Sequence, residues 1–221
     1  MSDYVRPLSP PRVFVDDLGE PIRYGERWGA GSPPDDSYSV TSNLERFAPL
    51  HDVAERLIDW LVESYDVTVE DSPAMAGDLL RPPTDVVRAV RVRPADADAA
   101  ALTFVFTSFP GIHLHAGCLV DVFSPVCGCD ACDETWESCA TMLEDAVFAV
   151  ASGGLSEAYT RGAQLPVSFR LEFAEGWTGG SSSEADYPAE RLDAARRMLT
   201  PLRVWVPWPA RSASTRAVRP A

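Results

Sequence analysis

The sequence predicts a single α+β domain in which a largely antiparallel sheet is covered by two longer helices and one short helix. Three observations support this prediction. Apolar residues recur at helical spacing in three segments, and they alternate or run continuously in six shorter ones. The connections between neighbouring strand segments are mostly short. Short connections favour antiparallel pairing, because parallel strands need a crossover of a dozen or more residues.

The chain divides into three parts by its local composition. Residues 1–42 are rich in proline and glycine and lack a sustained periodicity, so we expect an irregular arm. Residues 43–208 hold all the periodic segments and form the predicted domain. Residues 209–221 are expected to be a frayed tail. The apolar segment 202–208 either docks on the domain or forms an exposed strip that binds a partner.

The helices are predicted from their apolar stripes and their end signals. Residues 49–65 carry the clearest pattern, and Asn43 is expected to cap this helix. A second helix is expected to start after Asp133, acting as its cap, and to end near Ser152, because two glycines follow. Residues 188–199 form the short third helix.

The strands are predicted from period-two alternation. They are residues 67–70, 85–93, 102–109, 112–123, 155–161 and 167–175. Residues 112–123 are expected to form one straight strand, with Cys118 buried on one face and His113 and His115 together on the other. Residues 176–183, rich in glycine and serine, are interpreted as a flexible loop.

The charge of the chain limits its partners. The formal net charge is −14, which repels phosphate backbones and anionic lipid surfaces, so we expect neither nucleic acid nor a membrane as partner. The one candidate basic patch, Arg88, Arg91 and Arg93, lacks interleaved aromatic residues, and we interpret it as the solvated side of a strand. An acidic surface favours a basic protein partner.

The basic residues exclude several enzyme classes. All 19 are arginine, and the chain contains no lysine. Enzymes that depend on a phosphate-loop lysine, a Schiff-base lysine or a kinase-type lysine are therefore excluded. No apolar run approaches the roughly 18 residues that cross a bilayer, and residues 1–12 lack the apolar core of a secretory signal, so we expect a cytoplasmic protein.

Cysteine usage points to metal binding or redox chemistry. Five cysteines are an odd number, and a cytoplasmic setting argues against a disulfide framework. Cys118 and Cys139 are interpreted as small core residues. The other three, Cys127, Cys129 and Cys132, fall within six residues and form the only cluster of chemically potent side chains in the sequence.

The cluster has the spacing of a zinc site. Cys129-x-x-Cys132 is the usual spacing of a zinc knuckle, and Cys127 adds a third sulfur within reach. A structural zinc ion needs a fourth ligand. In a straight strand His115 would lie about 26 Å from Phe123, at the wrong end of the sheet. The candidates for the fourth ligand are Asp121, Asp133, Glu134 and His115.

Three other interpretations of the cluster remain open. With a water as fourth ligand the site would be open and catalytic, and Asp133 or Glu134 would act as base. Cys129 and Cys132 could instead form a redox dithiol, since the dipole of the following helix would lower the pKa of Cys132. The cysteines could also be reduced loop residues beside the turn-forming Gly128.

Three segments together resemble a known family. They are Tyr24-Gly25 with Arg27-Trp28, the run Glu45-Arg46-Phe47-Ala48-Pro49-Leu50-His51, and Pro125-Val126-Cys127-Gly128-Cys129-Asp130-Ala131-Cys132-Asp133-Glu134. Over roughly residues 24–205 the chain resembles an uncharacterised actinobacterial family of unknown function with the signature Cys-Gly-Cys-Asp-x-Cys-Asp-Glu. The resemblance implies no activity and no catalytic residue. It points to Arg27, Trp28, Arg46 and His51 as a second patch, for which the alternative is packing of the arm on the first helix.

The sequence therefore favours a non-enzymatic, acidic, soluble protein with a zinc-thiolate site and a basic protein partner. The alternatives are a metal-dependent enzyme with an open thiolate zinc site and a Cys-x-x-Cys redox protein.

Overall fold

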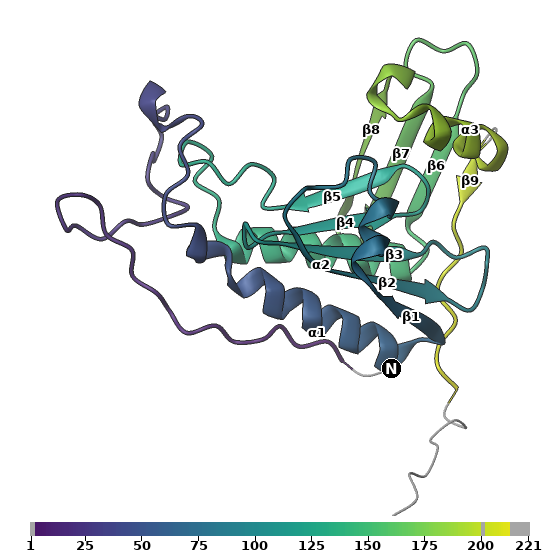
Figure 1. Cartoon of the computed structure of the whole chain (residues 1–221), viewed down its shortest axis with the longest axis horizontal. Helices are drawn as coiled ribbons and strands as arrows, with labels where there is room; N and C mark the ends of the chain where they lie inside the picture. Colours follow the sequence, from purple (N-terminus) through teal and green to yellow (C-terminus); the bar gives the residue numbers. More distant parts are fainter. Residues whose placement is uncertain (1–2, 200–201, 213–221) are drawn as a thin grey trace, which may run out of the picture.

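The computed structural model describes residues 3–199 and 202–212, which form two antiparallel sheets and three α-helices (Figure 1). The first sheet has the order β1 (Val67–Asp71), β2 (Val86–Pro94), β3 (Leu102–Thr107), β4 (Ile112–Ala116) and β5 (Val120–Ser124). The second has the order β8 (Gly176–Ser182), β7 (Val167–Phe173), β6 (Leu155–Tyr159) and β9 (Arg203–Val204). The predicted α+β class is confirmed, with two sheets in place of one.

The helices α1 (Pro49–Ser64) and α2 (Trp136–Ala151) cover one face of the first sheet (Figure 1). They pack against each other, and α2 also contacts β7, so it links the two sheets. The apolar stripe predicted for α1 is buried; Leu50, Leu57 and Leu61 are fully inaccessible to solvent. The short helix α3 (Ala189–Met198) lies beside the second sheet (Figure 1). All three helices lie where the apolar spacing predicts them.

The predicted straight strand 112–123 is wrong, because the chain reverses direction in its middle. Residues 112–116 and 120–124 form the hairpin β4–β5, in which His115 pairs with Asp121. The turn contains Gly117 at φ +63, and the buried Glu157 carboxylate accepts the backbone N–H of Cys118 at 3.0 Å. Apolar alternation continues through this turn, which hides it in the sequence. Cys118 is therefore half-buried in the turn rather than on a strand face.

The loop predicted for residues 176–183 is also wrong, because this segment forms β8 and pairs with β7 along its whole length. Glycine and serine have low strand propensity, so the sequence gives no strand signal here. The absence of a side chain is what permits the pairing. A Cβ on Gly179 would lie 2.5 Å from the carbonyl oxygen of Phe169 on β7.

Neither predicted helix cap is observed. Asn43 lies before the 3₁₀ segment Leu44–Phe47 and has a left-handed backbone. Its side-chain amide donates a hydrogen bond to the Tyr24 hydroxyl at 2.9 Å and does not cap α1. The cap of α2 is Thr135, whose hydroxyl accepts the backbone N–H of Ser138 at 3.2 Å.

The apolar segment 202–208 docks on the domain. Trp205 and Trp208 are buried in the main core, and the indole N–H of Trp208 donates to the carbonyl oxygen of Ala100 at 2.8 Å. Ala210 forms an isolated bridge with Tyr65. Of the tail expected to fray, residues 213–221 lie outside the described residues.

The arm, residues 3–42, is irregular apart from the 3₁₀ turn Asp35–Ser37 and an isolated antiparallel bridge between Val15 and Pro21. It runs along α1 and then loops out beside the segment that joins β5 to α2 (Figure 1). Its beginning is fixed on α2, because the Tyr4 hydroxyl donates to the Glu144 carboxylate at 2.7 Å and Arg6 forms an ion pair with the same group.

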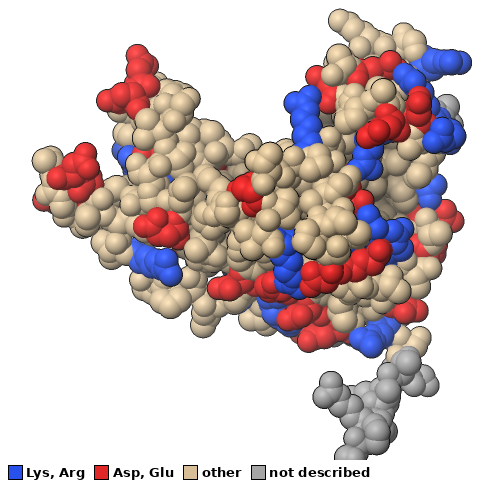
Figure 2. All heavy atoms as spheres, viewed as in Figure 1, with Lys and Arg blue, Asp and Glu red and all other residues tan. Residues whose placement is uncertain are grey.

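Each arginine of the candidate basic patch is paired with a carboxylate. Arg88 pairs with Asp71 at 2.7 Å, and both Arg91 and Arg93 reach Glu70, at 3.2 and 3.7 Å. Figure 2 shows positive and negative side chains next to one another over this part of the surface. The patch is thus locally neutralised. Among the described helices, none is both long and apolar enough to cross a membrane.

Candidate metal centre

The segment between β5 and α2 brings three sulfur atoms together. The Sγ atoms of Cys127, Cys129 and Cys132 all lie within 4.8 Å of one another. Among the described residues, this is the only group of three or more histidine, cysteine or carboxylate side chains close enough to hold a metal ion. Cys129 is buried, whereas Cys127 and Cys132 are exposed. The structure therefore assembles the cluster that the sequence spacing predicts, at one solvent-facing point.

Glu134 holds the cysteine loop closed. Its carboxylate accepts three backbone N–H groups, from Val126 at 2.9 Å, Cys127 at 3.0 Å and Gly128 at 2.8 Å. Three such hydrogen bonds to one carboxylate fix the start of the loop relative to its end. Glu134 thus joins the entry of the loop to its exit, and Ser124 at the loop entry adds a hydrogen bond to the carbonyl oxygen of Cys139 on α2 at 3.2 Å.

Gly128 is required at its position for two reasons. Its φ of +75 lies in the left-handed region, which residues with a Cβ rarely adopt. A Cβ there would also lie 2.7 Å from the ring of Phe109. The loop between the first two cysteines is therefore packed directly onto the end of the β3–β4 hairpin.

The thiols interact with one another. Hydrogen bonding from Cys127 lowers the pKa of Cys129 to about 7, and hydrogen bonding to Cys129 raises the pKa of Cys132 to about 12. Cys129 is therefore more readily ionised than Cys132, contrary to the expectation that the helix dipole lowers the pKa of Cys132. A bound metal would displace the remaining protons, because thiolates are its ligands.

Cys118 and Cys139 lie apart from the cluster. Cys139 is buried in the main core, as predicted, and burial raises its pKa to about 12. Burial likewise raises the pKa of Cys118 to about 11. Both are therefore protonated thiols near neutral pH.

Asp130, inside the loop, is bound by the arm. This buried carboxylate accepts the backbone N–H of Ser42 at 3.0 Å and its hydroxyl at 2.7 Å. Its backbone N–H donates to the carbonyl oxygen of Val40 at 2.8 Å. The guanidinium groups of Arg27 and Arg46 each lie 3.7 Å from it. From the sequence, Asp130 is a turn-forming residue and one of the carboxylates near the cysteines; its role in holding the arm could not be predicted, because Ser42 lies 88 positions away.

Arg46 lies between the arm and the loop. It is only 4% exposed, and it donates hydrogen bonds to the carbonyl oxygens of Gly128, at 2.8 Å, and Ser42. Its guanidinium stacks between the rings of Tyr24 and Phe47, 4.3 Å from each centroid. A buried arginine with this many partners fixes the position of the chain on both sides of it.

Three members of the proposed second patch meet at the cysteine loop. Besides Arg46, the backbone N–H of Arg27 donates to Asp133 at 2.9 Å, and the indole N–H of Trp28 donates to the carbonyl oxygen of Asp130 at 3.2 Å. His51 does not belong with them, since it lies on α1 with its ring edge-on to Phe106. The part of the arm around Arg27 and Trp28 thus packs on the loop, whereas Tyr4 near its start packs against Trp60 of α1.

The four candidates for a fourth ligand have different environments. His115 and Asp121 bind each other, with 2.6 Å between Nδ1 and Oδ1, near the turn of the β4–β5 hairpin. His115 therefore lies away from the cysteine loop, as the sequence predicts. The reason differs, because the prediction assumed a straight strand and the chain instead turns back after residue 116. Glu134 is occupied by three N–H groups. Asp133 is buried, and its Oδ1 has no hydrogen-bond partner.

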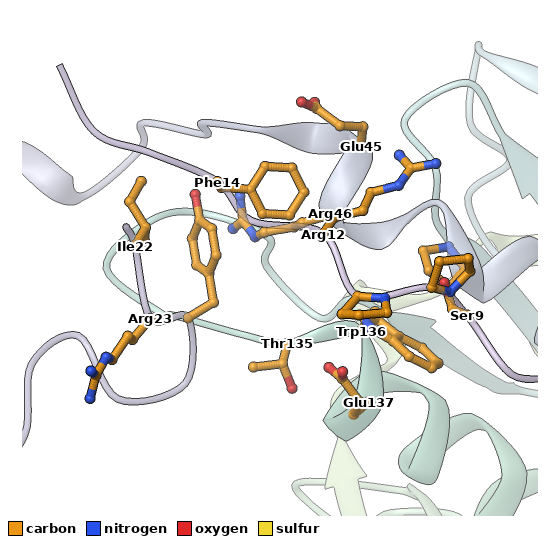
Figure 3. Close-up of a pocket in the computed structure, with 14 residues that line it drawn as sticks. Ser9, Arg12, Phe14, Ile22, Arg23, Glu45, Arg46, Thr135, Trp136 and Glu137 are labelled. Atoms are coloured by element: carbon orange, nitrogen blue, oxygen red, sulfur yellow. The ribbon is translucent and has the colours of Figure 1, made fainter. Parts of the chain in front are cut away.

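A pocket of about 360 Å³ lies beside the loop. The arm, the 3₁₀ segment Leu44–Phe47 and the first turn of α2 line it; among the lining side chains are Phe14, Tyr24, Arg46 and Trp136 (Figure 3). Sequence analysis could not find this pocket, because its lining residues are spread over Ser9 to Glu137 and share no motif. Arg46 lines the pocket and also binds Gly128 of the cysteine loop, so it links the two.

Comparison with known proteins gives one match. A family model described as "Family of unknown function (DUF6226)" matches residues 10–212, which include most of the arm, both sheets and the cysteine loop. A search of curated proteins and a search of solved structures returned no match. Because the family model spans most of the 221 residues, the chain belongs to this family of unknown function.

Proposed function

We propose that the protein is a non-enzymatic binding protein in which Cys127, Cys129 and Cys132 hold one zinc ion. The observation that supports this most directly is the mutual approach of the three sulfur atoms to within 4.8 Å. Tetrahedral zinc with Zn–S bonds of about 2.3 Å places its sulfur ligands about 3.8 Å apart. The loop therefore needs only a small contraction to bind the ion.

Among the four candidates we propose Asp133 as fourth ligand, although its carboxylate lies outside the close group of three sulfur atoms and must move toward it to bind the ion. A buried carboxylate oxygen without a hydrogen-bond partner is costly, and Oδ1 of Asp133 is such an atom. Its Oδ2 is held by the backbone of Arg27. Asp121 and His115 are bound to each other, and Glu134 is bound to the loop backbone. Coordination by Asp133 would satisfy its free oxygen and close the site.

In this arrangement the ion has a structural role. It would fix the loop that carries Asp130 and Asp133, and these two residues hold the arm through Ser42, Arg27 and Trp28. The guanidinium groups that lie near Asp130 would also offset the negative charge of a three-thiolate site.

The proposed partner is a basic protein in the cytoplasm. The net charge of −14 would steer a cationic partner toward the protein and make the association sensitive to salt. A complex with a basic protein that weakens as ionic strength rises supports this part of the proposal. Binding that is independent of salt, or restricted to neutral partners, contradicts it.

One observation favours a second candidate, a metal-dependent enzyme with an open site. Cys127 and Cys132 are exposed, so a water molecule could reach the ion and take the fourth position. Asp133 would then be the base, since Glu134 is already occupied by three N–H groups. The redox alternative would use Cys129 and Cys132, and a reversible disulfide between them would support it.

The deciding experiment is metal content measured by elemental mass spectrometry on untagged protein purified under reducing conditions without chelator. We expect one zinc ion per chain, lost in a Cys129→Ser/Cys132→Ser variant and retained in the control Cys118→Ser, whose thiol lies outside the cluster. Protein without metal under these conditions overturns the zinc proposal. Asp133→Asn separates the two site types: weaker zinc binding supports the closed site, and unchanged binding supports the open one.

A further inference from the structure

A second, larger cavity of about 690 Å³ lies where the start of the arm, the C-terminal halves of α1 and α2, and the end of β7 come together. Its walls are largely aromatic and carry the side chains of Tyr4, Trp60, Tyr65, Phe148 and Phe173. Its lining also includes three carboxylates, those of Asp3, Asp145 and Glu172. None of the described lining residues is an arginine or a histidine.

The aromatic walls are held in place by contacts among themselves. Phe148 lies edge-on to Tyr4, with 5.3 Å between ring centroids, and edge-on to Trp60, with 5.1 Å. Trp60 is also edge-on to Tyr65 at 5.5 Å. The hydroxyl of Tyr4 donates to the buried carboxylate of Glu144 at 2.7 Å. The cavity is therefore preorganised and does not depend on a ligand to assemble it.

Two of the three carboxylates of the cavity, those of Asp3 and Asp145, have no ion-pair partner among the described residues. Glu172 has a partner, Arg170, at 2.9 Å. Burial and the neighbouring Glu144 raise the pKa of Asp145, and they outweigh the opposing effect of Arg6, whose guanidinium is paired with Glu144.

Aromatic walls with unpaired carboxylates are complementary to an organic cation. The faces of tryptophan and tyrosine rings attract ammonium groups, and the attraction grows as water is excluded. The aliphatic stem of a lysine side chain would pack on the rings while its charged end reaches the carboxylates. We propose that this cavity binds the side-chain ammonium group of a lysine presented by a partner protein.

The composition of the chain is consistent with such a ligand. The protein contains no lysine, so it offers no lysine side chain to the cavity of a second copy of itself. A cavity that takes lysine therefore favours a foreign partner over self-association. This inference rests on the basic partner proposed above, but it does not depend on the zinc site.

The test compares two peptides that differ in one charge. Acetyl-Gly-Lys-Gly-amide is titrated into the full chain. The uncharged control is the same peptide with norleucine in place of lysine. Binding is followed by changes in the tryptophan indole N–H resonances in NMR spectra. We expect the lysine peptide to bind about tenfold more tightly, from the combined attraction of the aromatic faces and carboxylates. Equal binding of the two peptides, or no binding of either, overturns the inference.

Matched variants place the effect in the cavity. Asp145→Asn is expected to weaken binding of the lysine peptide about threefold. Asp59→Asn removes an equal charge from an exposed position on α1, next to Trp60 but outside the cavity lining, and is expected to leave binding unchanged. Equal losses in the two variants would show that only the overall charge matters, and would overturn the assignment.

Two further measurements separate the proposals. Choline tests for a free cationic metabolite as ligand, and choline binding more than tenfold tighter than the lysine peptide overturns the partner lysine. Poly-lysine tests the partner class. If poly-lysine binds in a salt-dependent way and Asp145→Asn has no effect on it, the cavity inference fails and the basic-partner proposal stands. If poly-lysine does not bind, both fail.

Discussion

The guanidinium of Arg46 donates a hydrogen bond to the carbonyl oxygen of Gly128, 2.8 Å away, across 82 positions of the sequence. This contact joins the segment that enters α1 to the loop that carries the cysteines. Because Arg46 is buried and also stacks on Tyr24, it connects the arm, the domain and the candidate metal centre through one side chain.

Replacing Arg46 by lysine is expected to lower the free energy of unfolding by about 2 to 3 kcal/mol, because an ammonium group cannot make both hydrogen bonds and the stacking contacts of a guanidinium. Urea denaturation provides the measurement. Arg56→Lys is the control, since Arg56 on α1 makes only a 3.4 Å ion pair with Glu63. Similar losses in both variants would contradict the importance of the Arg46 contacts.

Gly128→Ala is expected to destabilise the protein by roughly 3 kcal/mol, from the left-handed backbone and from overlap with Phe109. The control is Gly162→Ala, because Gly162 has φ +81 but no neighbouring atom within 4 Å of the point where a Cβ would lie. Its cost is expected to be about 1 kcal/mol, from the backbone alone. Chemical denaturation gives the loss of unfolding free energy in each variant, and the difference between the two losses measures the overlap with Phe109. Equal losses would argue against close packing at Gly128.

Glu134→Ala is expected to weaken zinc binding about 10- to 100-fold, because the three N–H groups of the loop lose their common acceptor. Competition with a chromophoric chelator gives the affinity. Glu137→Ala, three residues further along and exposed, is the control and should bind zinc as the wild type does. Wild-type zinc affinity in Glu134→Ala would show that the Glu134 carboxylate does not organise the site.

The pH dependence of stability is expected to include a contribution from His113. Burial lowers the pKa of its imidazole, so in mildly acidic solution the unfolded chain binds a proton that the folded chain does not. The contribution of His113 to the free energy of unfolding is therefore fully present above about pH 6.5, the pKa of histidine in the unfolded chain, and it is lost as the pH falls below that value. Melting temperatures between pH 7.5 and 5.5 should fall more steeply for the wild type than for His113→Phe. Parallel curves would contradict this assignment.

The longer helices and most strands could be predicted from the sequence, because their apolar residues repeat with the period of the element. The stripe of Leu50, Leu57 and Leu61 defines α1 without further information. The reversal at Gly117 could not be predicted, since one buried carboxylate, that of Glu157, accepts the N–H groups of the turn from a distant strand. The pairing of β8 with β7 depends on the close approach of Gly179 to the backbone of Phe169. Strand propensities do not predict such a contact, because they rate glycine as a poor strand residue.

At the candidate site the sequence placed the three cysteines correctly, because their spacing is local. It misplaced the cap of α2, because Asp133 has φ +51 and is engaged with the backbone of Arg27. It also could not show that Asp130 is bound by Ser42, since that contact spans 88 positions. Contacts of this kind are set by tertiary structure rather than by a motif.

The attachment of the arm determines the order in which the chain can complete its fold. Arg6 binds Glu144, 138 positions away, and Arg27 binds Asp133, 106 positions away. Contacts of such long sequence separation form late, because the intervening chain must first be ordered. During synthesis the arm leaves the ribosome before α2, yet it cannot dock until α2 has emerged. The arm is therefore expected to be among the last parts of this domain to fold, and the cysteine loop stays uncovered until then.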